Sequence, residues 1–213
     1  MPNWCACNYA IQGDREELEA FVNILNTMEN HSNGFGRFWM GNLLYHFGID
    51  VKNTAIHCRG TFSPNANEIA CLCGPDIDEE ASFSIDEDGI LRMSTVSAWD
   101  RSSDIEYLLQ TKFPSFEFNF QATDEFGNFH HIRDPYGVGG FPVYCLDADG
   151  DIFEYDNNEA NKFIEKLKEV CPGLDVPDDI NEIETDGFCQ KFIEWREEDE
   201  ERDFISFYIA EEV

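Results

Sequence analysis

The sequence predicts a mixed α+β fold, and three observations support this prediction. Segments in which apolar and polar residues alternate indicate strands, and segments with apolar residues at helical spacing indicate helices. With residues 30–78 set aside as an insertion, residues 3–122 read in the order strand, helix, strand, strand, helix, strand. This order is typical of a split βαβ, ferredoxin-like sheet with helices on one face. Residues 123–213 are expected to add a β-hairpin and a helical extension.

The first strand and the first helix follow each other directly. Residues 4–11 alternate and favour a strand, which Gly13 ends. A helix is expected over residues 14–28, because apolar side chains recur there at helical spacing and form one stripe. Asp14 and Glu17 have the spacing of a capping box, although that motif prefers Ser or Thr at its first position.

Residues 30–78 are interpreted as an insertion. Their first part, residues 30–54, is rich in glycine and is expected to hold one short helix. Residues 56–62 and 69–73 have the composition of two further short strands.

A β-hairpin is expected around Asp88 and Gly89, because this pair of residues tolerates the positive φ angles of a tight turn. Its strands are residues 83–85 and 91–96, on either side of the turn, and Trp99 ends the second strand. These two strands are the middle pair of the predicted ferredoxin-like order.

The second helix and the fourth strand complete that order. The helix is predicted over residues 104–112, with Ser103 and Glu106 at the spacing of a capping box. Pro114 ends the helix, and the alternating Phe side chains of residues 116–120 predict a strand. Residues 1–122 are therefore expected to form one ferredoxin-like domain.

Residues 123–213 are predicted to form an acidic α+β extension, either as a separate lobe or as a continuation of the same sheet. The predicted elements are, in chain order, a strand at 126–132, a hairpin of residues 143–146 and 152–155 around Asp149-Gly150, a helix at 160–170, a helix around 188–195 and a strand at 204–209.

Four short segments, taken together and in order, form a pattern that is moderately specific for a protein family. They are residues 1–8 (MPNWCACN), 13–17 (GDREE), 58–60 (CRG) and 95–99 (TVSAW). In this order they resemble the YubB-like family of plasmid and phage proteins. The resemblance implies a mobile-element origin and a ferredoxin-like domain without an iron–sulfur cluster. It implies no catalytic residues, and it does not extend to residues 123–213.

The charge of the chain indicates the class of partner. The sequence has 44 Asp and Glu against 14 Lys and Arg, a formal net charge of −30. Such a surface repels nucleic acid and anionic membranes and attracts basic protein surfaces. The chain is not a disordered acidic tail, because its 19 Phe residues and 42% hydrophobic content are sufficient for a core.

The sequence also predicts a location. The first 20 residues lack the basic start and apolar run of a secretion signal, and no stretch approaches the roughly 18 apolar residues that span a bilayer. The protein is therefore expected in the cytoplasm, which is the host cytoplasm if a phage encodes it. Its eight Cys are expected to be reduced there.

Neither a metal nor a cofactor is predicted. Cys5 with Cys7, and Cys71 with Cys73, would each place two thiols on one face of a strand, and four thiolates that met would suit zinc. A core role is favoured, because free Cys is commonly buried and zinc sites usually separate paired Cys by two residues. Residues 147–151 carry three Asp, but they lack the Gly and Glu positions of an EF-hand, so a hairpin turn is favoured.

No catalytic residues are predicted either. His130 and His131 are adjacent in an expected strand, so their side chains point to opposite faces, and no nucleophile is recognisable beside them. Residues 137–140 are rich in glycine but lack the Lys of a phosphate loop, and they are interpreted as a connector. Arg59 is expected to form a structural ion pair rather than to bind an anion.

These observations favour a non-enzymatic protein-binding module of a mobile element. Carboxylates on a rigid surface can imitate the phosphates of DNA, so the module is expected to inhibit a basic or nucleic-acid-binding partner, as in counter-defence. The alternative is a cytoplasmic domain that binds a small ligand or a metal, and a metal-dependent enzyme is less favoured. Trp195 is expected either as an aromatic anchor or as a core residue. The predicted carboxylate contacts are Asp76, Asp78, Glu79, Glu80, Glu197, Glu198, Asp199, Glu200 and Glu201.

Overall fold

The chain forms two compact units, unit 1 (residues 1–139 with Val213) and unit 2 (residues 140–212). A computed structural model describes residues 4–31, 36–64, 82–99, 101–124, 130–183, 185–199, 202 and 204–212. The division between the units lies 17 residues beyond the boundary expected at residue 122, because the strand that follows residue 124 pairs with the sheet of unit 1.

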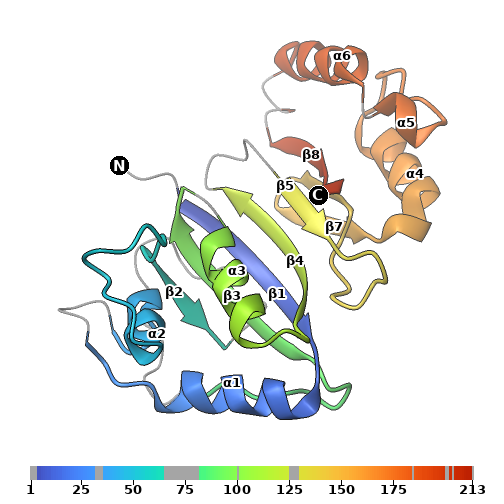
Figure 1. Cartoon of the computed structure of the whole chain (residues 1–213). Coiled ribbons are helices and arrows are strands. Elements are labelled where there is room, and N and C mark those ends of the chain that lie inside the picture. The colour runs from blue at the N-terminus through green and yellow to red at the C-terminus, as the bar shows by residue number, and fades with distance from the viewer. Residues whose placement is uncertain are drawn as a thin grey trace. The chain divides into compact units, whose positions relative to one another are not determined.

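Unit 1 is a mixed α+β structure built on an antiparallel sheet, as the sequence predicts (Figure 1). Its strands lie in the order β2-β3-β1-β4-β5, and every neighbouring pair is antiparallel. The elements are β1 (Trp4–Gln12), α1 (Arg15–Thr27), α2 (Met40–His46), β2 (Gly60–Ser63), β3 (Leu91–Ala98), α3 (Ser103–Lys112), β4 (Glu117–Asp124) and β5 (His130–Arg133).

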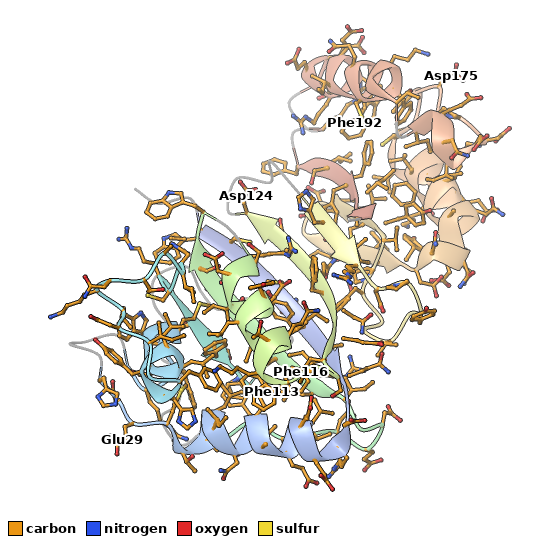
Figure 2. The ribbon with its side chains drawn as sticks, in the orientation of Figure 1. Glu29, Phe113, Phe116, Asp124, Asp175 and Phe192 are labelled. Carbon is orange, nitrogen blue, oxygen red and sulfur yellow. The ribbon has the colours of Figure 1, made fainter. Side chains whose placement is uncertain are left out.

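The core of unit 1 lies on one face of this sheet. Alternate residues of β1 are buried on that face, namely Cys5, Cys7, Tyr9 and Ile11. The three helices contribute to the same core, and Figure 1 shows α3 lying across the sheet. Phe113 and Phe116 stack at 4.9 Å between ring centroids and close the core near α1 (Figure 2). Period-two burial in β1 therefore defines the face against which the helices pack.

The prediction of a strand at residues 83–85 is wrong. The partner of β3 is β2, which lies inside the supposed insertion, whereas Ile85 forms only an isolated bridge with Leu91. The turn at Asp88-Gly89 is present, but the Asp86 carboxylate accepts the backbone N–H groups of Asp88 and Ile90. These hydrogen bonds tie the segment into a local loop rather than a ladder. The short strand predicted at 69–73 lies outside the described residues.

Both predicted capping boxes are also wrong. Asp14 precedes α1 without a side-chain capping bond, and the Glu17 carboxylate instead accepts the backbone N–H and the hydroxyl of Ser115. Ser102, rather than Ser103, precedes α3, and the carboxylate of Glu106 points into the core. In each case the acidic side chain that local spacing assigns to a helix end hydrogen-bonds instead to a residue distant in sequence. Glu17 bonds to Ser115, and Glu106 bonds to Tyr9.

Unit 2 is a three-stranded antiparallel sheet packed against helices. The strand order is β7-β6-β8. The elements are β6 (Tyr144–Ala148), β7 (Asp151–Tyr155), the short helix η1 (Asn157–Glu159), α4 (Ala160–Val170), α5 (Ile180–Ile183), α6 (Asp186–Glu197), β8 (Ile205–Ile209) and β9 (Glu211–Glu212). Leu146, Phe163, Leu167 and Ile183 are completely buried, which gives this unit its own core.

Most sequence predictions for unit 2 are confirmed. The helix predicted at residues 160–170 is α4, and the strand predicted at 204–209 is β8. Asp149 and Gly150 have φ angles of 59° and 85°, as a tight turn between β6 and β7 requires. The Asp147 carboxylate accepts the Gly150 N–H at 3.1 Å, so this aspartate supports the hairpin turn.

Candidate functional site

Three of the predicted contact residues lie together on the surface of unit 2. Glu197, at the end of α6, and Glu198 and Asp199, directly after it, are all exposed. Arg202 is within 3.5 Å of Glu198 and 3.9 Å of Asp199, so this corner is partly neutralised. The other six predicted carboxylates, Asp76, Asp78, Glu79, Glu80, Glu200 and Glu201, lie outside the described residues.

Trp195 is a core residue and not an exposed anchor. Its side chain is 6% exposed, and its indole N–H donates to the carbonyl of Pro172 at 3.2 Å. The guanidinium of Arg202 lies over the indole ring, 4.4 Å from the ring centroid. The helical position of Trp195 explains this, because Phe188, Phe192 and Trp195 recur at spacings of four and three on the buried face of α6.

The negative charge is concentrated in unit 2. Residues 140–212 contain 23 Asp and Glu against six Lys and Arg, a formal net charge of −17 in 73 residues. Four of the six cations form ion pairs with carboxylates of the same unit, namely Lys162, Lys166, Lys168 and Arg202. Exposed carboxylates occur on β7, α4 and α6 and on the segment around Asp175 (Figure 2). The described exposed carboxylates of unit 2 therefore come from several elements rather than from one.

Unit 2 also contains a groove of about 940 Å³ between α6 and β8. Figure 2 shows Phe192 on the side of α6 that faces β8. Arg196 is the only charged residue among the described residues that line the groove. The other lining residues are Val143, Tyr144, Asn157, Ile183, Cys189, Phe192, Ile193, Ser206, Phe207, Tyr208, Ile209 and Ala210. The floor of the groove is thus largely apolar, although the unit around it is strongly acidic.

One wall of the groove is the edge of a sheet. Residues 206–210 line it consecutively, although the side chains of successive strand residues point to opposite faces. Because the groove is lined by residues whose side chains point to both faces, it runs along the edge of β8. Among the described residues, β8 pairs only with β6, so its other edge is open.

The opposite wall is one face of α6. Cys189, Phe192, Ile193 and Arg196 follow a spacing of three, one and three residues, which places them on one side of the helix. Thr185 begins α6, and its hydroxyl accepts the N–H of Phe188. The helix spacing was visible in the sequence, but nothing local indicated that an open strand edge would lie opposite it.

The candidate metal ligands are not brought together in the described part of the chain. Cys5 and Cys7 are each 1% exposed and point into the core of unit 1, and burial raises the pKa of the Cys7 thiol well above its usual value. Cys71 and Cys73 lie outside the described residues. Within those residues, no three His, Cys, Asp or Glu side chains are grouped so that they could hold a metal ion.

A buried polar network in unit 1 was not foreseen from the sequence. The Tyr9 hydroxyl lies 2.7 Å from Oε1 of Glu106 and 2.6 Å from the carbonyl oxygen of Arg101. Nε of Arg101 donates to Glu106 at 3.2 Å, and burial raises the pKa of Tyr9. These groups hydrogen-bond to one another, so the network has a structural role without any ligand.

The remaining candidate residues occupy unit 1. Arg59 forms no ion pair with the described residues, and its guanidinium instead lies 5.0 Å from the ring centroid of Trp99, which is 54% exposed. The strand that carries His131 is present as β5. The segment interpreted as a connector is anchored, because Arg92 donates to the carbonyls of Val138 and Gly139.

Comparisons with protein-family models, curated proteins and solved structures found no match to this chain. Among the described residues, no helix combines the length and the apolar character required to cross a membrane.

Proposed function

We propose that this protein is a non-enzymatic binding module in which unit 2 engages a basic protein partner. The observation that carries the proposal is the charge of −17 in unit 2, which persists after four of its six cations have been paired locally. Such a surface raises the association rate with cationic proteins and repels nucleic acid. Occupation of a partner's nucleic-acid site by these carboxylates would inhibit that partner.

We further propose that unit 1 is a ferredoxin-like domain of mobile-element origin. The strand order β2-β3-β1-β4 with antiparallel neighbours supports this assignment of topology. The distribution of carboxylates over several elements favours electrostatic capture of a basic surface over imitation of a single DNA strand. Counter-defence in the host cytoplasm is the corresponding biological role.

The test is affinity capture from a host lysate by the full-length tagged protein at low salt and at about 0.5 M salt, with mass spectrometry of the eluted proteins. We expect a basic protein that is retained at low salt and lost at high salt, because screening removes the charge attraction. The variant E197Q/E198Q/D199N is expected to retain several-fold less of this partner.

The control variant is E16Q/E87Q/E117Q, which makes the same change in net charge at exposed positions of unit 1. It is expected to retain the partner almost as well as the natural protein. Equal loss in the two variants would show that total charge alone determines capture. The proposed function would be overturned if the captured partner were retained equally at low and high salt, or if no basic protein were captured.

A further inference from the structure

We infer that the groove between α6 and β8 receives an extended, lysine- or arginine-rich segment of the partner, which adds to unit 2 as a fourth strand beside β8. This inference rests on the proposed function and specifies where the basic partner is held. β-strand addition supplies affinity through main-chain hydrogen bonds and selectivity through alternate side chains.

The backbone of β8 offers the necessary hydrogen-bonding groups. The Ala210 N–H donates to the carbonyl of Val143 at 2.9 Å, and the Asp149 N–H donates to the carbonyl of Phe204 at 3.3 Å. Hydrogen-bonded and non-hydrogen-bonded residue pairs alternate along an antiparallel ladder. The backbone N–H and C=O groups of the even-numbered residues of β8 therefore point toward β6. The N–H and C=O groups of Ile205, Phe207 and Ile209 consequently face the open edge. The five residues of β8 provide an edge about 17 Å long.

The lining of the groove and the acidic surface around it contact different side chains of the bound segment. Ile193, which is 39% exposed on the α6 wall, gives an apolar contact to side chains on one face of an extended segment. Arg196 carries N–H donors that can bind its carbonyl oxygens. The carboxylates of unit 2 outside the groove attract the intervening side chains, which are therefore basic.

Two other occupants match these features less well. A second copy of this chain would bring a charge of −30 to a unit that already carries −17. A compact small molecule would fill the apolar floor but leave the strand edge without partners. An extended basic segment satisfies both the backbone groups of β8 and the charge of the unit.

The experiment uses three synthetic heptapeptides with blocked termini and the full-length protein. The first alternates lysine and valine, the second replaces lysine by glutamate, and the third is the lysine–valine peptide with N-methyl groups on alternate backbone nitrogens. We expect binding of the first peptide, no detectable binding of the second, and at least tenfold weaker binding of the third. N-methylation retains the charge but removes strand pairing.

Amide hydrogen exchange supplies a residue-specific readout. On addition of the lysine–valine peptide, the amides of Ile205, Phe207 and Ile209 should gain at least tenfold protection. The amides of Ser206 and Tyr208 face β6 and should change little. Uniform protection or none along β8 would contradict strand addition.

A matched pair of variants tests the α6 wall. Ile193 is 39% exposed and lines the groove, whereas Gln190 is exposed on the same helix outside it. I193K should weaken binding of the lysine–valine peptide at least tenfold and Q190K less than threefold, with both variants folded by circular dichroism. Equal effects, no binding of the lysine–valine peptide, or equal binding of its N-methylated form would overturn the groove assignment. Salt-sensitive capture of a basic protein would still support the proposed function.

Discussion

Tyr9 organises the polar groups inside unit 1. Its hydroxyl reaches Glu106 and the carbonyl of Arg101 on a segment more than 90 residues away, and its ring lies 6.1 Å from those of Phe118 and Phe120. Arg101 covers the Phe120 ring at 4.4 Å and pairs with Glu106. The burial of Glu106, at 8% exposure, is tolerated because two hydrogen-bond donors meet it.

Replacement of Tyr9 by Phe is expected to lower the free energy of unfolding by about 1–3 kcal/mol, because it removes one donor from a buried carboxylate. The measurement is the midpoint of urea unfolding. Y107F provides the control, since Tyr107 is 74% exposed on α3, and it should change stability by less than about 0.5 kcal/mol. Equal midpoints for Y9F and the natural protein would show that the hydroxyl is not needed.

The position of β2 in the sheet is determined by packing rather than by a strong local sequence pattern. It has only four residues, yet it pairs with β3 and contributes Phe62, which is fully buried. Its first residue is Gly60, and a Cβ atom there would lie 2.6 Å from the Val96 carbonyl oxygen and 2.8 Å from Sδ of Met40. The close approach of α2 and β3 at this point therefore requires glycine.

The variant G60A is expected to lower the free energy of unfolding by about 1–3 kcal/mol, because backbone or core atoms must move to admit the methyl group. G187A is the matched control: a Cβ at Gly187 in α6 would meet only Thr185 Oγ1 at 3.8 Å. It should leave stability unchanged or raise it by up to about 1 kcal/mol. Thermal unfolding of both variants checks this, and a neutral G60A would contradict the close packing described for β2.

The whole molecule has a net charge of −30, and this charge affects its stability. Most of the described carboxylates lie on the surface, where ion pairs contribute little and repulsion is screened by salt. The molecule is therefore expected to be more stable at moderate than at very low ionic strength.

Raising sodium chloride from about 20 mM to about 300 mM should raise Tm. A recovery of about 1 kcal/mol corresponds to roughly 2–4 °C for a protein of this length. Calorimetry of the six-site variant E16Q/E87Q/E117Q/E197Q/E198Q/D199N provides the control, because fewer like charges should reduce this salt dependence. A Tm that falls with salt, or an equal slope in the variant, would show that self-repulsion is not important.

The sequence by itself determined the elements whose signals are local. The apolar spacing of α4, the alternation of β8 and the turn at Asp149-Gly150 depend on neighbouring residues, and all three were predicted within a few positions. The total charge, on which the proposed class of partner depends, also follows from composition alone. Trp195 was left between surface and core, because helical periodicity without the packing partners does not decide which stripe is buried.

Only the tertiary structure decided which distant residues meet. It selected β2 over residues 83–85 as the partner of β3, turned Glu17 and Glu106 away from the helix ends, and placed the open edge of β8 opposite α6. Strand pairing and burial depend on contacts between segments tens of residues apart, and local propensity contains no information on them. The acidic character of this protein thus follows from its composition, whereas the groove of unit 2 depends on the fold, which places α6 opposite the outer edge of β8, an edge without a strand partner among the described residues.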